Sequence, residues 1–420
     1  MAPDAARAAA ADLIMAALAR EAAVGEEAPA LAGLAAPARA RALRLARMTL
    51  RHLDRADRLL ERHLRRPPPP ESHAILRLAT VEMMEGGTPL HAGVDAAVTL
   101  ARKGGEGQAR LVNAVLRRIA ATSPADWAAL PPQRLPGWLR GRLSSAYGNA
   151  TVARIEAVHA AAPPLDLTPR DGDAPALARA VSGRALATGS VRLPPGTGVA
   201  ALPGYGEGAF WVQDAAAALP ARLIGARPEM RVLDLCAAPG GKTMQLAATG
   251  AGVTALDISP ARLDRLRANL ARTGLSAELM AADAREFDPG HQFDAVLLDA
   301  PCTATGTIRR HPEIQFQDRR AMLKRLAGVQ AELIDRALAL TRPGGLCVYC
   351  TCSLLPEEGE AQIAAALMRH PGLVVRPPEL AGLEARWRDS TGALRIRPDH
   401  WAEPGGIDGF YIAVLITPGA

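Results

Sequence analysis

The sequence has 420 residues, of which 49% are hydrophobic, and a formal net charge of +6. This length allows two or three domains, and the apolar content excludes wholesale disorder. No apolar stretch free of charges or glycine reaches the roughly 18 residues of a membrane span. The first residues also lack the basic start of a signal peptide. We therefore expect a cytoplasmic protein without a membrane segment.

Residues 1–125 predict an all-helical domain. Apolar residues recur there at spacings of three, four and seven. One helical pattern runs from Leu43 to Leu64 and is ended by the prolines at 67–70. The region carries 18 Lys and Arg against 13 Asp and Glu, an excess of five that accounts for most of the net charge. A basic helical domain without a catalytic residue set predicts binding to a polyanion.

The rest of the chain predicts two further parts. Residues 126–210 predict a helical linker and a small α/β subdomain, with strands at 165–168 and 199–202 and a helix at 174–181. Residues 211–420 alternate strand and helix, which predicts a Rossmann-like, doubly wound and mostly parallel sheet. The expected strands there are 232–236, 253–257, 277–280, 293–298, 346–349, 373–375 and 411–416, and the expected helices include 262–272 and 321–340.

The five cysteines all lie in the second half of the chain. Their odd number does not fit a disulfide framework. Cys347 and Cys350 have the spacing of zinc ligands, but on a strand they would point to opposite faces. We therefore predict no metal site and interpret Cys347 as part of the core.

A turn of small residues predicts a cofactor site after the first strand of the large sheet. Small side chains let a ligand approach the backbone, and the helix that follows offers free N–H groups. The turn has the spacing of neither a phosphate P-loop nor a dinucleotide-binding loop. Its residues are Cys236, Ala237, Ala238, Pro239, Gly240, Gly241 and Lys242.

Two aspartates add to this expectation. Asp257 ends the second strand, where a carboxylate takes the ribose hydroxyls in nucleoside-binding sheets. Asp283 follows the third strand, where it can accept from an adenine amino group. Each alone is more often a helix cap. Together with the turn they favour an adenosyl cofactor without phosphates.

Two short stretches each place a thiol directly after a buried strand. Cys302 follows Asp299 at the end of one strand, and Cys352 follows Thr351 at the end of the next. In open α/β sheets, ligands lie outside the carboxyl ends of the strands. A thiolate there can attack an electron-poor ring, and a carboxylic acid can hydrogen-bond it. The alternative is that one thiol is merely packed.

These motifs, in this order, resemble the Sun/RsmB branch of RNA cytosine-C5 methyltransferases. The motifs Gln213-Asp214 and Asp408-Gly-Phe-Tyr411 also fit that branch. The stretch 110–118 after two glycines resembles the last helix of NusB-type RNA-binding domains. One departure is Thr303-Ala304, where relatives carry Ser-Gly. The two resemblances together cover nearly the whole chain.

The resemblance implies roles for the singled-out residues. Cys352 would attack cytosine C6, Cys302 would help release the enzyme, and Asp299 would hold the base and border the cofactor. The cofactor implied is S-adenosyl-L-methionine, bound by the turn 236–242 with Asp257 and Asp283. The partner implied is RNA, specifically 16S rRNA, with no obligate protein partner.

Three other interpretations stay open from the residues alone. A DNA cytosine methyltransferase would use Cys302 as the nucleophile, although Thr351-Cys352 and the helical domain speak against it. A non-catalytic RNA-binding assembly factor would need neither thiol. The enzyme could also methylate another RNA.

Overall fold

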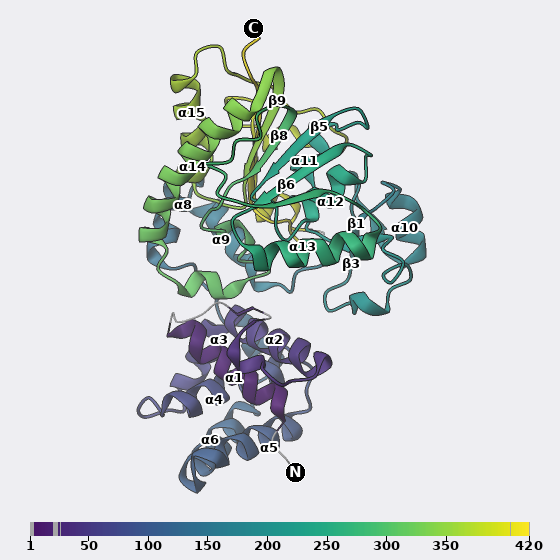
Figure 1. Cartoon of the computed structure of the whole chain (residues 1–420). Coiled ribbons are helices and arrows are strands. Elements are labelled where there is room, and N and C mark those ends of the chain that lie inside the picture. The colour runs from purple at the N-terminus through teal and green to yellow at the C-terminus, as the bar shows by residue number, and fades with distance from the viewer. Residues whose placement is uncertain (1–3, 20–23, 26, 404, 420) are drawn as a thin grey trace. The chain divides into compact units, whose positions relative to one another are not determined.

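The computed structural model describes residues 4–19, 24–25, 27–403 and 405–419 (Figure 1). The chain forms two compact units. One comprises Met1–Ala162 with Ile308–Asp318, and the other comprises Pro163–Thr307 with Arg319–Ala420. Within the described ranges, none of the helices has both the length and the apolar character needed to cross a bilayer.

The first unit is helical, as the apolar periodicity predicts. Its core is lined by leucine, isoleucine, valine and alanine side chains from α1 to α6. A later piece of chain, η5 (Pro312–Phe316), also belongs to this unit, and Phe316 packs against the same core. The α-helices are α1 (Ala5–Leu18), α2 (Ala36–Arg51), α3 (Leu53–Glu61), α4 (Pro70–Met84), α5 (Leu90–Ala101), α6 (Glu106–Ile119), α7 (Pro124–Ala129), α8 (Gly137–Tyr147) and α9 (Asn149–Ala160).

The expectation of one continuous helix from Leu43 to Leu64 is wrong. The chain leaves helical geometry at His52, which has φ −115° and ψ 21°, so α2 ends there and α3 begins. The apolar spacing continues across the break because residues such as Leu50 and Leu60 enter the same core. The spacing of apolar residues shows which face of a helix is buried, but it does not reveal a break of one residue between two helices.

The second unit begins with a small antiparallel sheet in the order β2-β3-β1-β4. Its elements are β1 (Leu165–Pro169), α10 (Ala174–Ala180), β2 (Arg184–Ala185), β3 (Val191–Leu193) and β4 (Phe210–Val212). The predicted strand and helix at 165–168 and 174–181 are confirmed, whereas the strand predicted at 199–202 is wrong. That segment contains the short helix η3 (Val199–Ala201), because its apolar side chains pack onto the core without pairing to a strand.

The large sheet has eight strands in the order β10-β12-β9-β8-β5-β6-β7, with β11 paired to β12. The five strands β7, β6, β5, β8 and β9 run parallel, while β10, β11 and β12 are antiparallel additions. The strands are β5 (Arg231–Leu235), β6 (Gly252–Asp257), β7 (Glu278–Ala281), β8 (Phe293–Asp299), β9 (Thr341–Thr351), β10 (Val374–Val375), β11 (Leu394–Ile396) and β12 (Phe410–Ile416). The predicted Rossmann-like sheet is therefore confirmed.

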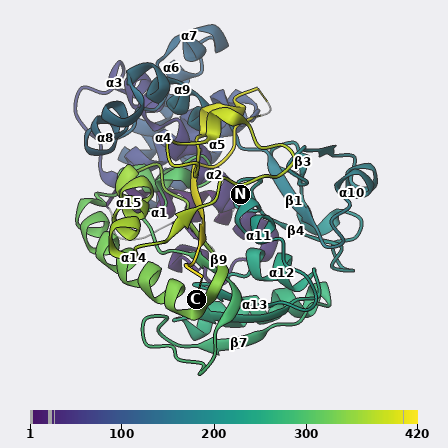
Figure 2. The same cartoon turned by 90° about the horizontal axis from the view of Figure 1, so that it is seen from above.

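Helices cover both faces of this sheet, as Figures 1 and 2 show. The helices α14 (Arg320–Leu340) and α15 (Glu360–Arg369) cover one face. The helices α11 (Leu219–Ile224) and α12 (Gly241–Ala247) lie on the other, and α13 (Pro260–Thr273) packs beside them. Because side chains alternate along a strand, Cys347 enters the first layer and Cys350 the second, as predicted.

Candidate active site

The carboxyl ends of β8 and β9 bring the two thiols together. The strands pair in parallel, and Asp299 lies opposite Cys350. The chain continues from these ends into the two cysteine loops, where the Sγ atoms of Cys302 and Cys352 lie 3.5 Å apart. Two cysteines that are fifty residues apart in the sequence are therefore in direct contact.

Backbone hydrogen bonds fix the loop around Cys302. Ala300 N–H donates to the Cys350 carbonyl and Gly306 N–H to the Cys352 carbonyl, each at 2.9 Å. Gly409 N–H donates in turn to the Gly306 carbonyl at 2.8 Å. A Cβ atom on Gly306 would lie 2.0 Å from the Gly409 carbonyl oxygen, so only glycine fits there.

A buried lysine faces the carboxylate beside the thiols. The Lys242 Nζ atom lies 2.7 Å from Asp299 Oδ2 and 5.4 Å from the centre of the Phe410 ring. Burial lowers the pKa of Lys242, but the Asp299 carboxylate outweighs this and leaves the pKa raised. Lys242 therefore stays an ammonium ion, paired with the Asp299 side chain.

Several thiols near this edge of the sheet resist ionisation. The hydrogen bond with Cys352, followed by burial, raises the pKa of Cys302 well above its usual value. Burial raises the pKa of Cys236 to about 12, and burial with the nearby Asp299 charge raises that of Cys350. Thiols of this kind carry a proton at neutral pH, so Cys302 enters any reaction as a proton-bearing neighbour of Cys352.

The turn 236–242 and Asp257 form one assembly at the ends of β5 and β6. The Asp257 carboxylate, 1% exposed, accepts from Ala238 N–H at 3.1 Å and from Ser259 N–H at 3.0 Å. Gly240 has φ +104°, and a Cβ atom there would lie 2.0 Å from Leu266 Cδ1. The turn therefore needs a residue without a side chain at position 240.

Asp283 is bound differently from the expectation. Its carboxylate is held by the Arg285 guanidinium, with Asp283 Oδ2 to Arg285 Nη2 at 2.6 Å, and by Arg285 N–H at 3.0 Å. The side-chain hydrogen bond from Arg285 lowers the pKa of Asp283. An adenine amino group would have to share this carboxylate with Arg285.

Three polar residues contact the region of the cofactor turn, namely Gln213, Asp214 and Asp408. Gln213 Nε2 donates to Gln245 Oε1 in α12 at 2.8 Å, and Gly241 packs against the Gln213 side chain. Asp408 N–H donates to Asp214 Oδ1 at 3.2 Å, although 194 residues separate them. These bonds join the segment 213–214 to α12 and to the residues just before β12.

One buried carboxylate beside the thiols was given no role by the sequence reasoning. Glu358, fully buried, lies in the short helix η6 (Pro356–Glu358) that follows Cys352. Its side chain accepts from Thr303 N–H at 2.8 Å. The only signal in the sequence is its place in the stretch that also holds Cys352, six residues further on.

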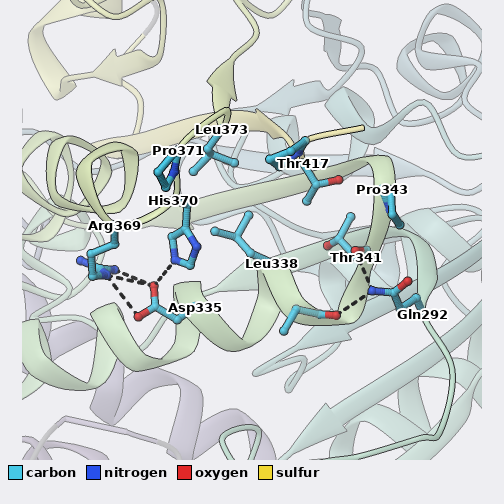
Figure 3. A pocket seen from close by; sticks show the side chains of 12 residues that line it. Gln292, Asp335, Leu338, Thr341, Pro343, Arg369, His370, Pro371, Leu373 and Thr417 are labelled. Carbon is cyan, nitrogen blue, oxygen red and sulfur yellow. Dashed lines mark hydrogen bonds and ion pairs between the residues drawn. The ribbon is translucent and has the colours of Figure 1, made fainter. Parts of the chain in front are cut away.

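The other end of the large sheet holds a separate pocket of about 400 Å³ (Figure 3). It lies at the start of β9, whose far end leads to Cys352. Thr341 and Cys350 of β9 lie opposite Phe293 and Asp299 of β8, so roughly 20 Å separate the pocket from the thiols. Its polar groups bind one another: His370 Nε2 lies 2.7 Å from Asp335 Oδ1, and Gln292 Nε2 donates to the Ala339 carbonyl. The first bond ties the end of α15 to α14, and the second ties the end of α14 to the residue before β8.

A Rossmann-like sheet with a small-residue turn after its first parallel strand and an acid ending the second defines an S-adenosyl-L-methionine-dependent methyltransferase. Comparison with known proteins places it further. Residues 221–416 match the family "16S rRNA methyltransferase RsmB/F", and residues 4–121 match the NusB family. The chain belongs to the RsmB/F family of rRNA methyltransferases.

Individual relatives agree with this placement. Ribosomal RNA small subunit methyltransferase B of Pseudomonas putida is 37% identical over 392 residues, which is 88% of each chain. The protein of the same name from Salmonella arizonae is 36% identical, covering 87% of this chain and 88% of its own. Among solved structures, PH0851 shares the fold with a TM-score of 0.73 and 21% identity over 99% of each chain. A methyltransferase homolog from Pyrococcus horikoshii is 26% identical, with a TM-score of 0.57 over 66% of this chain and 93% of its own.

Proposed function

We propose that this methyltransferase modifies C5 of a cytosine in 16S rRNA and that Cys352 is its nucleophile. The observation that carries the proposal is the thiol pair, with Cys302 and Cys352 in contact at 3.5 Å beside the Asp299 carboxylate. Cytosine C5 is a poor nucleophile until a group adds at C6. A thiolate next to a base-binding acid is the arrangement that such an addition requires.

The first step is addition of the Cys352 thiolate to C6. A bond forms between Sγ and C6, and the electron pair of the C5–C6 double bond moves toward C5. N3 takes up a proton from water as the thiolate adds, and the Asp299 carboxylate accepts hydrogen bonds from N3–H and the amino group, so the ring does not carry the full negative charge. Lys242, 2.7 Å from Asp299, keeps that carboxylate in place. C5 is now enamine-like and reactive.

S-adenosyl-L-methionine, when bound, supplies the methyl group that C5 receives. The residues of the turn 236–242 suit this cofactor, because their side chains are mostly small and Gly240 directly precedes the helix α12, whose first N–H groups are donors. Asp257 would hold the ribose hydroxyls and Asp283 the adenine amino group, while Asp299 borders both the cofactor and the base.

The last step returns the free enzyme. Cys302 takes the proton from C5, directly or through water, the C5–C6 double bond re-forms, and the bond between C6 and the Cys352 sulfur breaks. Before this step Cys302 gives its own proton to water, and its raised pKa makes the resulting thiolate a strong base. N3 returns its proton to water as the double bond re-forms. The target base has to leave any stack to reach these groups.

We further propose that residues 1–125 form a NusB-like RNA-binding domain, that 126–210 connect it, and that 211–420 carry the chemistry. The excess of five positive charges in the first part supports this division. Phosphate contacts from arginines there would contribute affinity without specifying the base.

The test is transfer of tritiated methyl groups from the cofactor into 16S rRNA, with another RNA and DNA as parallel substrates, followed by bisulfite mapping of the product. We expect label in 16S rRNA at the C5 position of cytosine. Label in DNA would favour the DNA-type enzyme, and label in another RNA would show that 16S rRNA is not the substrate. RNA binding without any label would support a non-catalytic assembly factor.

The two thiols are distinguished on a denaturing gel. Cys352→Ala should abolish methylation and form no covalent adduct. Cys302→Ala should still allow attack and methyl transfer but stall before elimination, so protein stays attached to RNA. An adduct with Cys352→Ala and none with Cys302→Ala would reverse the two roles.

A further inference from the structure

The buried carboxylate of Glu358 connects the two cysteine loops. Its Oε1 atom accepts from Thr303 N–H at 2.8 Å, and its Oε2 atom accepts from the Thr303 hydroxyl. Gln330 Nε2 donates both to Glu358 Oε1 at 3.2 Å and to the Pro301 carbonyl at 2.8 Å. The side chain thus fixes the residues on either side of Cys302.

The main chain of the same residue holds the other loop. The Glu358 carbonyl accepts from the Tyr349 hydroxyl and from the Thr351 hydroxyl, each at 2.9 Å. These donors are the last residues of β9 before Cys352. Glu358 therefore binds the Cys302 loop through its side chain and the end of β9, just before Cys352, through its carbonyl group.

This division has a consequence for substitutions. A change at position 358 alters only the side chain, so the carbonyl bonds to Tyr349 and Thr351 can persist. The bonds that would be lost are those to Thr303 and, through Gln330, to Pro301. Loss of the side chain should therefore loosen the Cys302 loop more than the end of β9 that precedes Cys352.

We propose that Glu358 is a positioning residue that sets the Cys302 thiol against Cys352 and thereby governs release of the enzyme from methylated RNA. The inference rests on the proposed roles of the two cysteines. A general base must lie within hydrogen-bond reach of the proton it removes, and a small displacement can slow such a step strongly. Attack by Cys352 does not depend on that position.

The experiment is the denaturing-gel assay with the full-length protein, 16S rRNA and S-adenosyl-L-methionine. Glu358→Ala should raise the ratio of covalent adduct to released methylated RNA about tenfold over wild type, in the direction of Cys302→Ala. Glu358→Gln keeps the shape but gives Thr303 N–H and its hydroxyl only one acceptor oxygen, so a smaller rise is expected. Thr303→Val removes one donor without a change in charge and should shift the ratio in the same direction.

A matched control separates positioning from general destabilisation. Thr341→Val removes one buried hydroxyl bond, to the Ala337 carbonyl at 2.8 Å, at the opposite end of β9. Its adduct ratio should equal that of wild type. Circular dichroism and cofactor binding show whether each variant is folded, and Thr303→Val serves if Glu358→Ala does not fold.

The outcomes are distinguishable. If Cys302→Ala accumulates adduct but Glu358→Ala and Thr303→Val lose adduct and product in proportion, Glu358 has a structural role only and the inference is wrong. If Cys302→Ala itself accumulates no adduct, the proposed roles of the thiols fail, whatever Glu358 does.

Discussion

Asp257→Asn tests the cofactor site most directly. The carboxylate is buried at the end of β6, and each of its oxygens already accepts one backbone N–H, from Ala238 and from Ser259. The Arg262 guanidinium also lies 3.3 Å from Asp257 Oδ2, and we assign the acceptor capacity that remains to the ribose hydroxyls. Asparagine keeps the size and one acceptor oxygen, but its amide nitrogen cannot accept and the charge is gone.

The magnitude follows from these bonds. A hydrogen bond to a charged group is worth about 1.5–3 kcal/mol, and the substitution removes one such bond and the charge from the other. We expect the affinity for S-adenosyl-L-methionine to fall by about 1–3 kcal/mol, which is roughly a 5- to 150-fold increase in Kd. Asp257→Ala, which also leaves both N–H donors without an acceptor, should lose at least as much. Isothermal titration calorimetry measures the change.

The chain offers a matched control in Asp294. Its carboxylate also accepts a backbone N–H, from Arg231 at 2.8 Å, but at the amino end of β8. Asp294→Asn should therefore bind the cofactor as wild type does. Unchanged affinity in a folded Asp257→Asn protein would refute the ribose assignment, and equal weakening in both variants would trace the effect to loss of stability.

Three further predictions concern charge. Burial raises the pKa of Asp234 to about 7, so the folded state keeps a proton that the unfolded state releases near pH 4; the stability it contributes is present below that pH and is lost as the pH rises through about 7. In urea unfolding, the stability of Asp234→Asn relative to wild type should therefore increase by roughly 2–4 kcal/mol as the pH rises from about 4 to about 8. A stability difference that does not change with pH would contradict the raised pKa of Asp234. Arg285→Ala frees Asp283 from a partly exposed ion pair worth about 1 kcal/mol or less, so cofactor affinity should rise by up to about fivefold, and a fall would show that Arg285 orients the carboxylate. Deleting residues 1–125 should weaken RNA binding and flatten its dependence on salt concentration, and unchanged affinity would give the domain another role.

The central strands were predictable because their burial is visible in the sequence. The runs before Cys302 and Cys352 are nearly all apolar, as expected of parallel strands covered on both faces, and β8 and β9 follow them. The short strands β3, β4 and β11 were missed, since three residues carry too little pattern to distinguish them from loops. The error at 199–202 has the same origin.

The site was predictable in composition and less so in its bonds. Strand order places Asp299 and the two cysteines together once a parallel sheet is assumed. The partner of Asp283 lies only two residues away in the sequence, yet a carboxylate after a strand has the same appearance whether it meets a ligand or an arginine. The bond between Glu358 and Thr303 joins residues 55 apart, and only packing decides it.

The two thiols contact each other equally, but different groups hold each of them in place. Both cysteines follow strand ends, and the distance between the sulfur atoms belongs to both. The backbone of Cys352 continues directly from β9, whereas Cys302 lies in a loop held by side-chain bonds to Glu358 and by the close approach of Gly306 to Gly409. Cys352 directly follows β9 and so has the fixed position that suits the proposed nucleophile, whereas the loop of Cys302 is held by the buried Glu358 carboxylate. The division of labour that we propose for the two cysteines therefore has a physical basis in the different groups that anchor each of them.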